Sequence, residues 1–364
     1  MHRFLRLFAL TAVVALLAAA CAQEEAETPT APGATTPSPT QALPGAGMKA
    51  CQVTDVGGID DKSFNQTAWA GVQRAQAELG VEGKFLESQT ADDYMPNIQT
   101  FINEGCDIII TVGFLLGDAT KAAAEANPDQ PFAIVDFAYD PPVPNVLGLT
   151  FATDQAAFLA GYLAAGMTKT GKVATYGGIK IPPVTIFMDG FLAGVRKYNQ
   201  DFGTDVQVLG WDGKEGAFTG NFENQDDGRR LTEDFISEGA DIILPVAGPV
   251  GFGTTAALQD SPQEDYAIWV DTDGCVSASE FCSLFLTSIM KNMDVAVFEA
   301  IKSVVEGRFE GGVYVGTLEN NGVGIAPFHE FEDVVPQELK DKLEELKQGI
   351  IDGTVSVKPD DYPA

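Results

Sequence analysis

The chain has 364 residues and carries 52 acidic against 22 basic side chains, which gives a formal net charge of −30 at neutral pH. A nucleic-acid backbone needs a basic surface, so this charge balance excludes DNA and RNA as partners and disfavours phosphorylated small ligands. Only His2 and His329 are present and no cysteine spacing is typical of zinc, so zinc chemistry and histidine-based catalysis are poorly supplied.

The first 47 residues have the composition of a secretion signal followed by a tether. Residues 1–20 open with the basic stretch Met1–Arg6 and continue with an apolar run that is too short to span a bilayer, as in a signal peptide. Leu17–Cys21 resembles a bacterial lipobox, which predicts lipidation of Cys21; an ordinary signal peptide that leaves a free cysteine is the alternative. Residues 21–47 lack large apolar side chains and are expected to form a flexible linker.

From Lys49 onward, short apolar runs alternate with stretches of helical spacing. This alternation predicts an α/β fold with parallel sheets and helices on both faces of each sheet. The expected strands are Ala50–Thr54, Asp107–Val112, Phe132–Asp136, Val173–Gly177, Asp205–Leu209, Asp241–Val246 and Tyr266–Asp271. Helical spacing is clearest in Asn97–Glu104, Phe158–Met167 and Thr185–Tyr198.

Two motifs occur twice in the same order. FINEGCDII at Phe101–Ile109 matches FISEGADII at Phe235–Ile243, and upstream of them AGVQR at Ala70–Arg74 matches AGVRK at Ala193–Lys197. The longer motif is typical of a helix end, a glycine C-cap and the start of a buried strand. We interpret the repetition as two lobes of one design; chance similarity is the alternative, since Glu-Gly-X-Asp is common before strands.

Two such lobes would face each other across a cleft. Open α/β sheets bind ligands at the carboxyl ends of their strands, so the residues that follow strands are the candidate contacts. We expect the first lobe to comprise residues 48–150 and about 280–318, and the second to comprise residues 151–279 and about 319–364.

Four cysteines follow Cys21, an even number that permits disulfides outside the cell. Cys275 and Cys282 are close enough in sequence to close a small loop. Cys51 and Cys106 each lie at the start of an expected strand and would bridge if these strands are neighbours.

The stretch DVGGIDDKSFNQ, Asp55–Gln66, lies at the connection between the first expected strand and the helix that follows it. Its glycines are followed by aspartates, which repel phosphate, and its acidic spacing does not match a calcium loop. With a phosphate loop and a calcium loop set aside, the stretch offers hydrogen-bond acceptors beside the aromatic ring of Phe64, a combination that suits an uncharged ligand. The alternative is structural: Asp61 or Ser63 caps the helix and Phe64 is a core residue.

At this point the chain resembles a known family. It is similar to the basic membrane proteins, also called purine nucleoside receptor lipoproteins. The stretches that carry the similarity are VGGIDDKSFNQTAWAGVQRA, FLAGYLAA at Phe158–Ala165, KTGKV at Lys169–Val173, GFLAGV at Gly190–Val195 and TSIMKNMD at Thr287–Asp294. The similarity extends in order over nearly the whole chain after residue 48. It implies a two-lobe periplasmic-binding-protein type I fold with the ligand in the inter-lobe cleft.

The resemblance also implies roles for individual residues. Phe64 and Phe222 would stack on the two faces of a base, while Asp55 and Asp61 would accept hydrogen bonds from its edge. The remaining implied ligand-binding residues are Asp136, which faces the cleft, Gly248, whose backbone approaches the sugar, and Asp271 and Lys291, which bind ribose hydroxyls. The chain departs from the family pattern between Trp211 and Gly220 and around the Cys275/Cys282 pair, so Asp273 is an alternative to Asp271.

The implied function is that of a substrate-binding lipoprotein of an ABC importer, anchored outside the cytoplasm to the bacterial cell membrane. It would bind a nucleoside, with a purine expected, and deliver it to a membrane permease as a monomer, with no cofactor and no metal. Two alternatives keep the fold: a receptor for a sugar or another small metabolite, and a surface sensor or adhesion lipoprotein. An enzyme is not expected. Asp60 and Asp61 resemble the paired carboxylates of a hydrolase, but the sequence has neither a nucleophile elbow nor the calcium-binding aspartate cluster that nucleoside cleavage would need.

Overall fold

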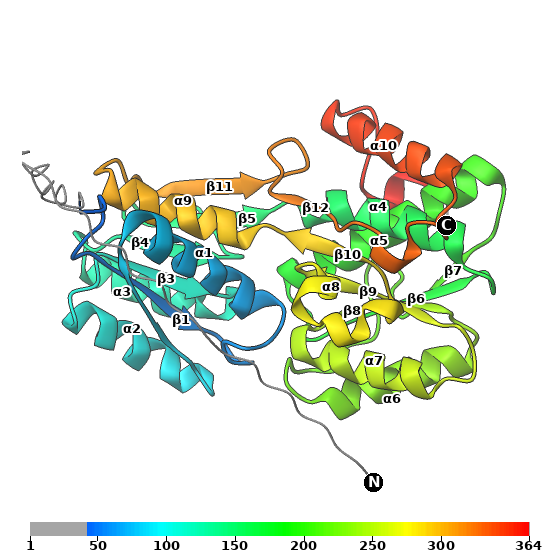
Figure 1. Cartoon of the computed structure of the whole chain (residues 1–364), viewed down its shortest axis with the longest axis horizontal. Helices are drawn as coiled ribbons and strands as arrows, with labels where there is room; N and C mark the ends of the chain where they lie inside the picture. Colours follow the sequence, from blue (N-terminus) through cyan, green and yellow to red (C-terminus); the bar gives the residue numbers. More distant parts are fainter. Residues whose placement is uncertain (1–41, 364) are drawn as a thin grey trace, which may run out of the picture. The chain divides into compact units, whose positions relative to one another are not determined.

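The computed structural model describes residues 42–363. The expected signal peptide, the expected lipidation site Cys21 and the linker as far as Gln41 lie outside the described residues. Within residues 42–363, the secondary structure forms two six-stranded sheets (Figure 1).

The first sheet has the strand order β11-β5-β4-β3-β1-β2, and all of its neighbouring strands are parallel. Its strands are β1 (Lys49–Thr54), β2 (Glu82–Leu86), β3 (Ile108–Val112), β4 (Phe132–Val135), β5 (Val146–Phe151) and β11 (Gly312–Gly316). One face is covered by α1 (Phe64–Leu79) and α9 (Met293–Val305), and the other by α2 (Tyr94–Asn103) and α3 (Gly117–Ala126). Successive residues of β3 are buried in the cores of opposite faces, as expected of a strand covered on both sides.

The second sheet has the corresponding order β12-β10-β9-β8-β6-β7, with only the edge strand β12 antiparallel to its neighbour among the described strands. Its strands are β6 (Lys172–Gly177), β7 (Gln207–Leu209), β8 (Ile242–Val246), β9 (Tyr266–Asp271), β10 (Phe285–Lys291) and β12 (Val323–Ile325). Its helices are α4 (Thr153–Met167), α5 (Pro182–Phe202), α6 (Gln225–Ser237), α7 (Gly251–Asp260), α8 (Gly274–Ser277) and α10 (Gln337–Ile351). Helices α4 and α5 pack on one face, and α7, with α6 packed against it, lies on the other. The prediction of two parallel sheets with helices on both faces is therefore confirmed.

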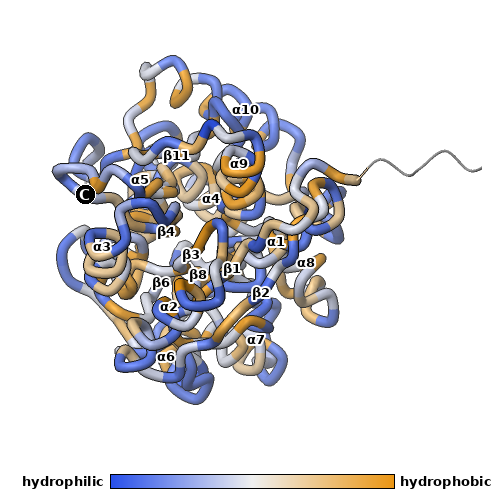
Figure 2. Tube along the Cα trace, turned by 90° about the vertical axis from the view of Figure 1, so that its left-hand side faces the viewer, coloured by the Kyte–Doolittle hydropathy of each residue, from blue (hydrophilic) through white to orange (hydrophobic). Residues whose placement is uncertain are grey.

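Helix hydropathy follows this layering. Helix α4 is buried over almost its whole length, because it lies between α5, β10 and α10. Helix α10 covers it from outside and is largely hydrophilic, whereas α9 carries mostly hydrophobic residues on the first sheet (Figure 2). A helix on the outside of a layer needs only one apolar stripe.

The repeated sequence motif has the same structure in both sheets. It ends α2 before β3 and α6 before β8. Gly105 and Gly239 adopt positive φ values of 66° and 96°, and the following N–H groups of Cys106 and Ala240 donate to carbonyls five residues back. Both copies thus end a helix with a left-handed glycine, where a side chain would be strained.

The chain crosses between the sheets three times: after β5, after β10, and between β11 and β12. The second crossing comes later than the expected position near residue 280, because β10 pairs with β9 and belongs to the second sheet. The crossing lies at Asn292, between β10 and α9. Backbone hydrogen bonds tie the crossings together, from the Ala152 N–H to the Gly316 carbonyl and from the Asn292 N–H to the Gly322 carbonyl.

The folded body begins before residue 48, so the expected linker boundary was too late. Gly45 is buried and its N–H donates to the Leu79 carbonyl at 2.8 Å, at the end of α1. A Cβ on Gly45 would lie 2.6 Å from a methyl carbon of Val81, so only a glycine lets the chain pass this closely. Residues 42–47 therefore pack against the amino-terminal end of the first sheet.

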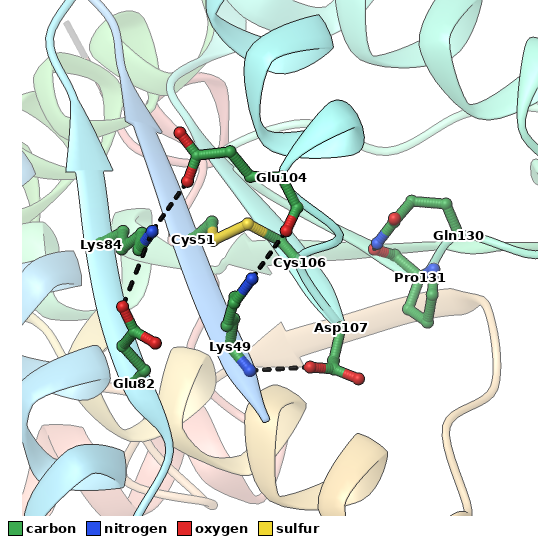
Figure 3. The surroundings of a disulfide bond; sticks show 9 residues. All are labelled: Lys49, Cys51, Glu82, Lys84, Glu104, Cys106, Asp107, Gln130 and Pro131. Atoms are coloured by element: carbon green, nitrogen blue, oxygen red, sulfur yellow. Dashed lines mark hydrogen bonds and ion pairs between the residues drawn. A yellow bond between two sulfur atoms is a disulfide. The ribbon is translucent and has the colours of Figure 1, made fainter. Parts of the chain in front are cut away.

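Two disulfides are formed within the described residues. Cys51–Cys106 joins β1 to the segment that leads into β3, with 6.1 Å between the Cα atoms (Figure 3). The Lys49 backbone N–H donates to Asp107 at 2.7 Å beside it, and the Lys49 ammonium donates to the Glu104 carbonyl at 2.7 Å. Cys275–Cys282 closes a short loop after β9, with a Cα separation of 4.5 Å.

Candidate ligand-binding site

A cavity lies at the carboxyl ends of the strands of both sheets. Its walls include residues that directly follow β1, β3, β4 and β8 or end β9 and β10, together with the first turns of α1 and α5. All eight residues proposed from the sequence as ligand-binding line this one cavity: Asp55, Asp61, Phe64, Asp136, Phe222, Gly248, Asp271 and Lys291.

Two aromatic rings reach the cavity from different lobes. Phe64 is the first residue of α1, and Phe222 lies in the loop before α6; both are half-buried. Phe222 packs directly on the backbone of Gly178, where an added Cβ would lie 2.3 Å from its ring. The Lys291 Nζ lies 4.8 Å from the centroid of the Phe64 ring, within the range of a cation–π interaction.

Asp55 and Asn65 form a buried polar pair in the first lobe. The Asn65 side-chain amide donates to the Asp55 carboxylate at 3.1 Å. The side-chain oxygen Oδ1 of Asn65 is buried and has no hydrogen-bond partner among the described residues. Burial raises the pKa of Asp55 well above its ordinary value, and the nearby carboxylates raise it further, although the hydrogen bond from Asn65 opposes the shift. The pair therefore offers the cavity acceptor atoms that a ligand must satisfy.

Gly113 leaves room for Asp55. It follows β3 with a φ of 118°, and a Cβ there would lie only 2.3 Å from an Asp55 carboxylate oxygen.

Asp61 both lines the cavity and caps α1. Its two carboxylate oxygens accept from the backbone N–H groups of Ser63 at 3.0 Å, Asn65 at 2.7 Å and Gln66 at 3.0 Å. Burial raises the pKa of Asp61 to about 7, against the effect of these hydrogen bonds. Of the two capping candidates, Asp61 fills the role, and this leaves its carboxylate little capacity for a further donor.

Ser63 instead links the two lobes. Its side chain makes no capping hydrogen bond, and its hydroxyl donates to the Asp271 carboxylate at 2.8 Å.

Lys291 lies between two aspartates from different lobes. Its side chain is 2% exposed, and its Nζ lies 2.5 Å from Asp136 of the first lobe and 3.7 Å from Asp271 of the second. Burial raises the pKa of both aspartates, and the charge of Lys291 opposes the shift. Both adopt left-handed backbone conformations, with φ of 64° and 69°, at equivalent positions after β4 and at the end of β9.

Asp271, not Asp273, lines the cavity. Asp273 caps the short helix α8 and pairs with the His329 Nε2 at 2.7 Å. Cys275 lies beside them, and single ligand atoms of the three residues approach within 4.8 Å of one another. Because the Cys275 sulfur is bound to Cys282, it provides no thiolate for a metal ion.

Several lining residues were missed by the sequence interpretation. Asn65 directly follows the predicted ring Phe64, but its place in the cavity depends on its buried hydrogen bond to Asp55, which the sequence does not show. Val184 and Phe187 come from the first two turns of α5. Since α5 follows β6 as α1 follows β1, the two-lobe repetition was a signal that could have placed these turns in the cleft.

The two lobes meet at a cavity lined by polar and aromatic side chains, an arrangement suited to binding a small solute. Within residues 42–363, no helix combines the length and the apolar character that a membrane span needs. A family model described as ABC transporter substrate-binding protein PnrA-like matches residues 48–361. The chain belongs to this family. It is accordingly a substrate-binding protein of an ABC transporter and not an enzyme, as predicted from the resemblance.

Individual relatives agree with this assignment. The chain is 32% identical over 329 residues to the "ABC transporter nucleoside-binding protein BmpA" of Lactococcus lactis, covering 85% of this chain and 89% of that one. It is 28% identical to an "uncharacterized lipoprotein" of Pyrococcus horikoshii, over 84% of this chain and 79% of that one. The crystal structure of an ABC transporter solute-binding protein from Aeropyrum pernix superposes with a TM-score of 0.77 at 29% identity, over 85% and 92% of the two chains.

Proposed function

We propose that the protein binds a nucleoside, with a purine base, and delivers it to an ABC permease. The observation that carries the proposal is the pairing of Phe64 and Phe222 from opposite lobes across a cavity rich in hydrogen-bond acceptors. A base stacked on an aromatic side chain gains on the order of 1–3 kcal/mol per ring. The name of the Lactococcus relative supports the same ligand class.

The base edge would lie against Asp55 and Asn65. The free side-chain oxygen of Asn65 and the Asp55 carboxyl group would accept hydrogen bonds from ring and amino N–H groups of a purine. Asp61, whose oxygens already accept three backbone N–H groups, would act mainly by fixing the first turn of α1 and hence Phe64.

The sugar would lie against Lys291 and the two aspartates beside it. A carboxylate next to an ammonium group binds a pair of adjacent hydroxyls, because one partner accepts and the other donates; Asp271 and Lys291 offer this to the ribose diol. Gly248 adds no side chain to this end of the cavity, and its φ of 52° favours glycine. Four carboxyl groups against one lysine disfavour a phosphorylated ligand.

The test is isothermal titration of the purified protein after unfolding and refolding with its disulfides intact, which removes ligand carried from the expression host. Guanosine, inosine, adenosine, uridine and ribose are titrated. Tight binding of a purine nucleoside without binding of ribose supports the proposal and ranks the bases. Binding of ribose as tight as that of inosine would instead identify a sugar receptor.

We propose further that Cys21 is lipidated and holds the protein at the outer face of the cell membrane. The support is the sequence alone, since Cys21 lies outside the described residues. Expression of the full chain in bacteria, with mass spectrometry of the membrane fraction, should find a diacylglyceryl modification that Cys21→Ser abolishes. Release of an unmodified wild-type protein into the medium would contradict the anchor.

A further inference from the structure

A second hollow borders the candidate ligand cavity. It shares three wall residues with the cavity, Phe114, Asp136 and Pro183, so both spaces meet at the same side chains. Its other lining residues are Phe137, Ala138, Thr150, Phe151, Thr153, Pro182 and Ile186. They come from both lobes: from the ends of β4 and β5 in the first, and from the starts of α4 and α5 in the second.

The hollow is largely apolar, and Asp136 is the one charged side chain among its lining residues in the described part of the chain. Its polar side chains already have partners: the Thr150 hydroxyl donates to the Tyr314 carbonyl at 2.9 Å, and Asp136 is paired with Lys291. The rings of Phe114 and Phe137 are in contact, with 5.0 Å between their centroids. No lysine or arginine lines the hollow among the described residues, so a phosphate would meet only Asp136.

The position of the hollow relates it to the sugar end of the ligand. Asp136 is its only residue that also belongs to the cluster with Lys291, which the proposed function assigns to the ribose. Once Asp271 and Lys291 hold the ribose diol and the rings hold the base, the 5′ carbon is the remaining position on the sugar that can carry a substituent.

We propose that the hollow receives an apolar substituent on the 5′ carbon, so that the substrate class includes 5′-alkylthio nucleosides. This inference rests on the proposed function and narrows its substrate class. Apolar area removed from water contributes about 25 cal/mol per Å², so a small buried alkylthio group tightens binding by roughly tenfold.

The test compares three ligands by isothermal titration: inosine, 5′-deoxyinosine and 5′-deoxy-5′-(methylthio)inosine, with the adenosine series alongside. The 5′-deoxy compound is the reference, because it lacks the hydroxyl and isolates the effect of the methylthio group. We expect the methylthio compound to bind about tenfold more tightly than its 5′-deoxy reference. Equal or weaker binding would overturn the inference while nucleoside binding itself stands.

Variants locate the effect. Ile186→Glu places a carboxylate in the hollow without touching the main cavity, and it should remove most of the preference while the affinity for the 5′-deoxy compound stays within about twofold. Phe202→Glu, an exposed position at the far end of the same helix, is the matched control and should keep the preference.

Ala138→Trp is a second variant, to be used if Ile186→Glu folds poorly. Ala138 is an exposed lining residue of the hollow, and a tryptophan at this position would fill the hollow. A preference that survives in a folded hollow variant would overturn the inference. If no nucleoside of any kind binds the wild type, the proposed function has failed, and the inference falls with it.

Discussion

Lys291→Met tests whether the buried charge cluster is balanced by a single ammonium group. Lys291 is 2% exposed and lies between Asp136 and Asp271, which are themselves buried. Methionine has a similar length but no charge, so the variant leaves two buried carboxyl groups without a counter-charge. Removing one partner of a buried ion pair costs about 3–5 kcal/mol of stability, because the remaining charge has lost its compensation.

The loss should depend on pH with a definite sign. Without Lys291, the pKa of Asp136 rises further above its unfolded value, so the folded state retains a proton that the unfolded state releases. Stability then falls as pH rises from about 4 through the folded pKa. The defect of Lys291→Met relative to wild type should therefore be larger at pH 8 than at pH 5.

The assay is urea unfolding of ligand-free protein, followed by tryptophan fluorescence and circular dichroism at both pH values. The double variant Lys291→Met/Asp136→Asn should recover part of the loss, since it removes a charge that has lost its partner. Lys180→Met is the control, because Lys180 pairs with Glu215 at an exposed site and such pairs contribute little. Equal stabilities of Lys291→Met and Lys180→Met would refute the reasoning.

Three further predictions concern the ring, the disulfide and the carboxyl cluster. Phe64→Ala should weaken nucleoside binding roughly 5- to 150-fold by titration with little change in melting temperature, whereas Phe202→Ala should leave binding unchanged. Replacing both Cys51 and Cys106 by alanine should lower the free energy of unfolding by about 4 kcal/mol, since the bridge spans 55 residues of sequence; an unchanged urea midpoint would contradict this. The ligand-free wild type should lose stability as pH rises from 5 to 8, because the folded pKa of Asp61 is raised to about 7 and its unfolded form releases the proton earlier; a midpoint that rises with pH would disprove the assignment.

The fold was largely predictable because the central strands are buried on both faces and therefore read as continuous apolar runs. Edge strands often lack this signal, although the edge strand β7 was predicted. β2, with the sequence EGKFL, is half-exposed, and in β11 the exposed Val313 and Val315 alternate with less exposed residues, so neither strand was predicted. The interior strands β5 and β10 and the edge strand β12 were also missed. A single residue, Asn292, separates β10 from the next helix, and the omission of β10 misplaced the second crossing.

The candidate site was predictable where its residues directly follow strands. Asp55 and Asp136 are of this kind, and their position at the cleft follows from the topology of parallel sheets. The free oxygen of Asn65 depends on side-chain packing within the first lobe, and the hollow near Ile186 depends on how side chains from two lobes pack together. The contacts around the hollow join residues far apart in the chain, so no local sequence pattern predicts them.

The three crossings between the sheets restrict how the two lobes can move. A single connection would allow free rotation, but here Ala152 is hydrogen-bonded to Gly316 and Asn292 to Gly322, so the connections form a short ribbon. Twisting one lobe against the other would break these bonds, whereas bending across the ribbon changes only a few backbone dihedral angles. We therefore expect the lobes to open and close by essentially one bending motion, so that each closure returns Lys291 of the second lobe to the same position opposite Asp136 of the first.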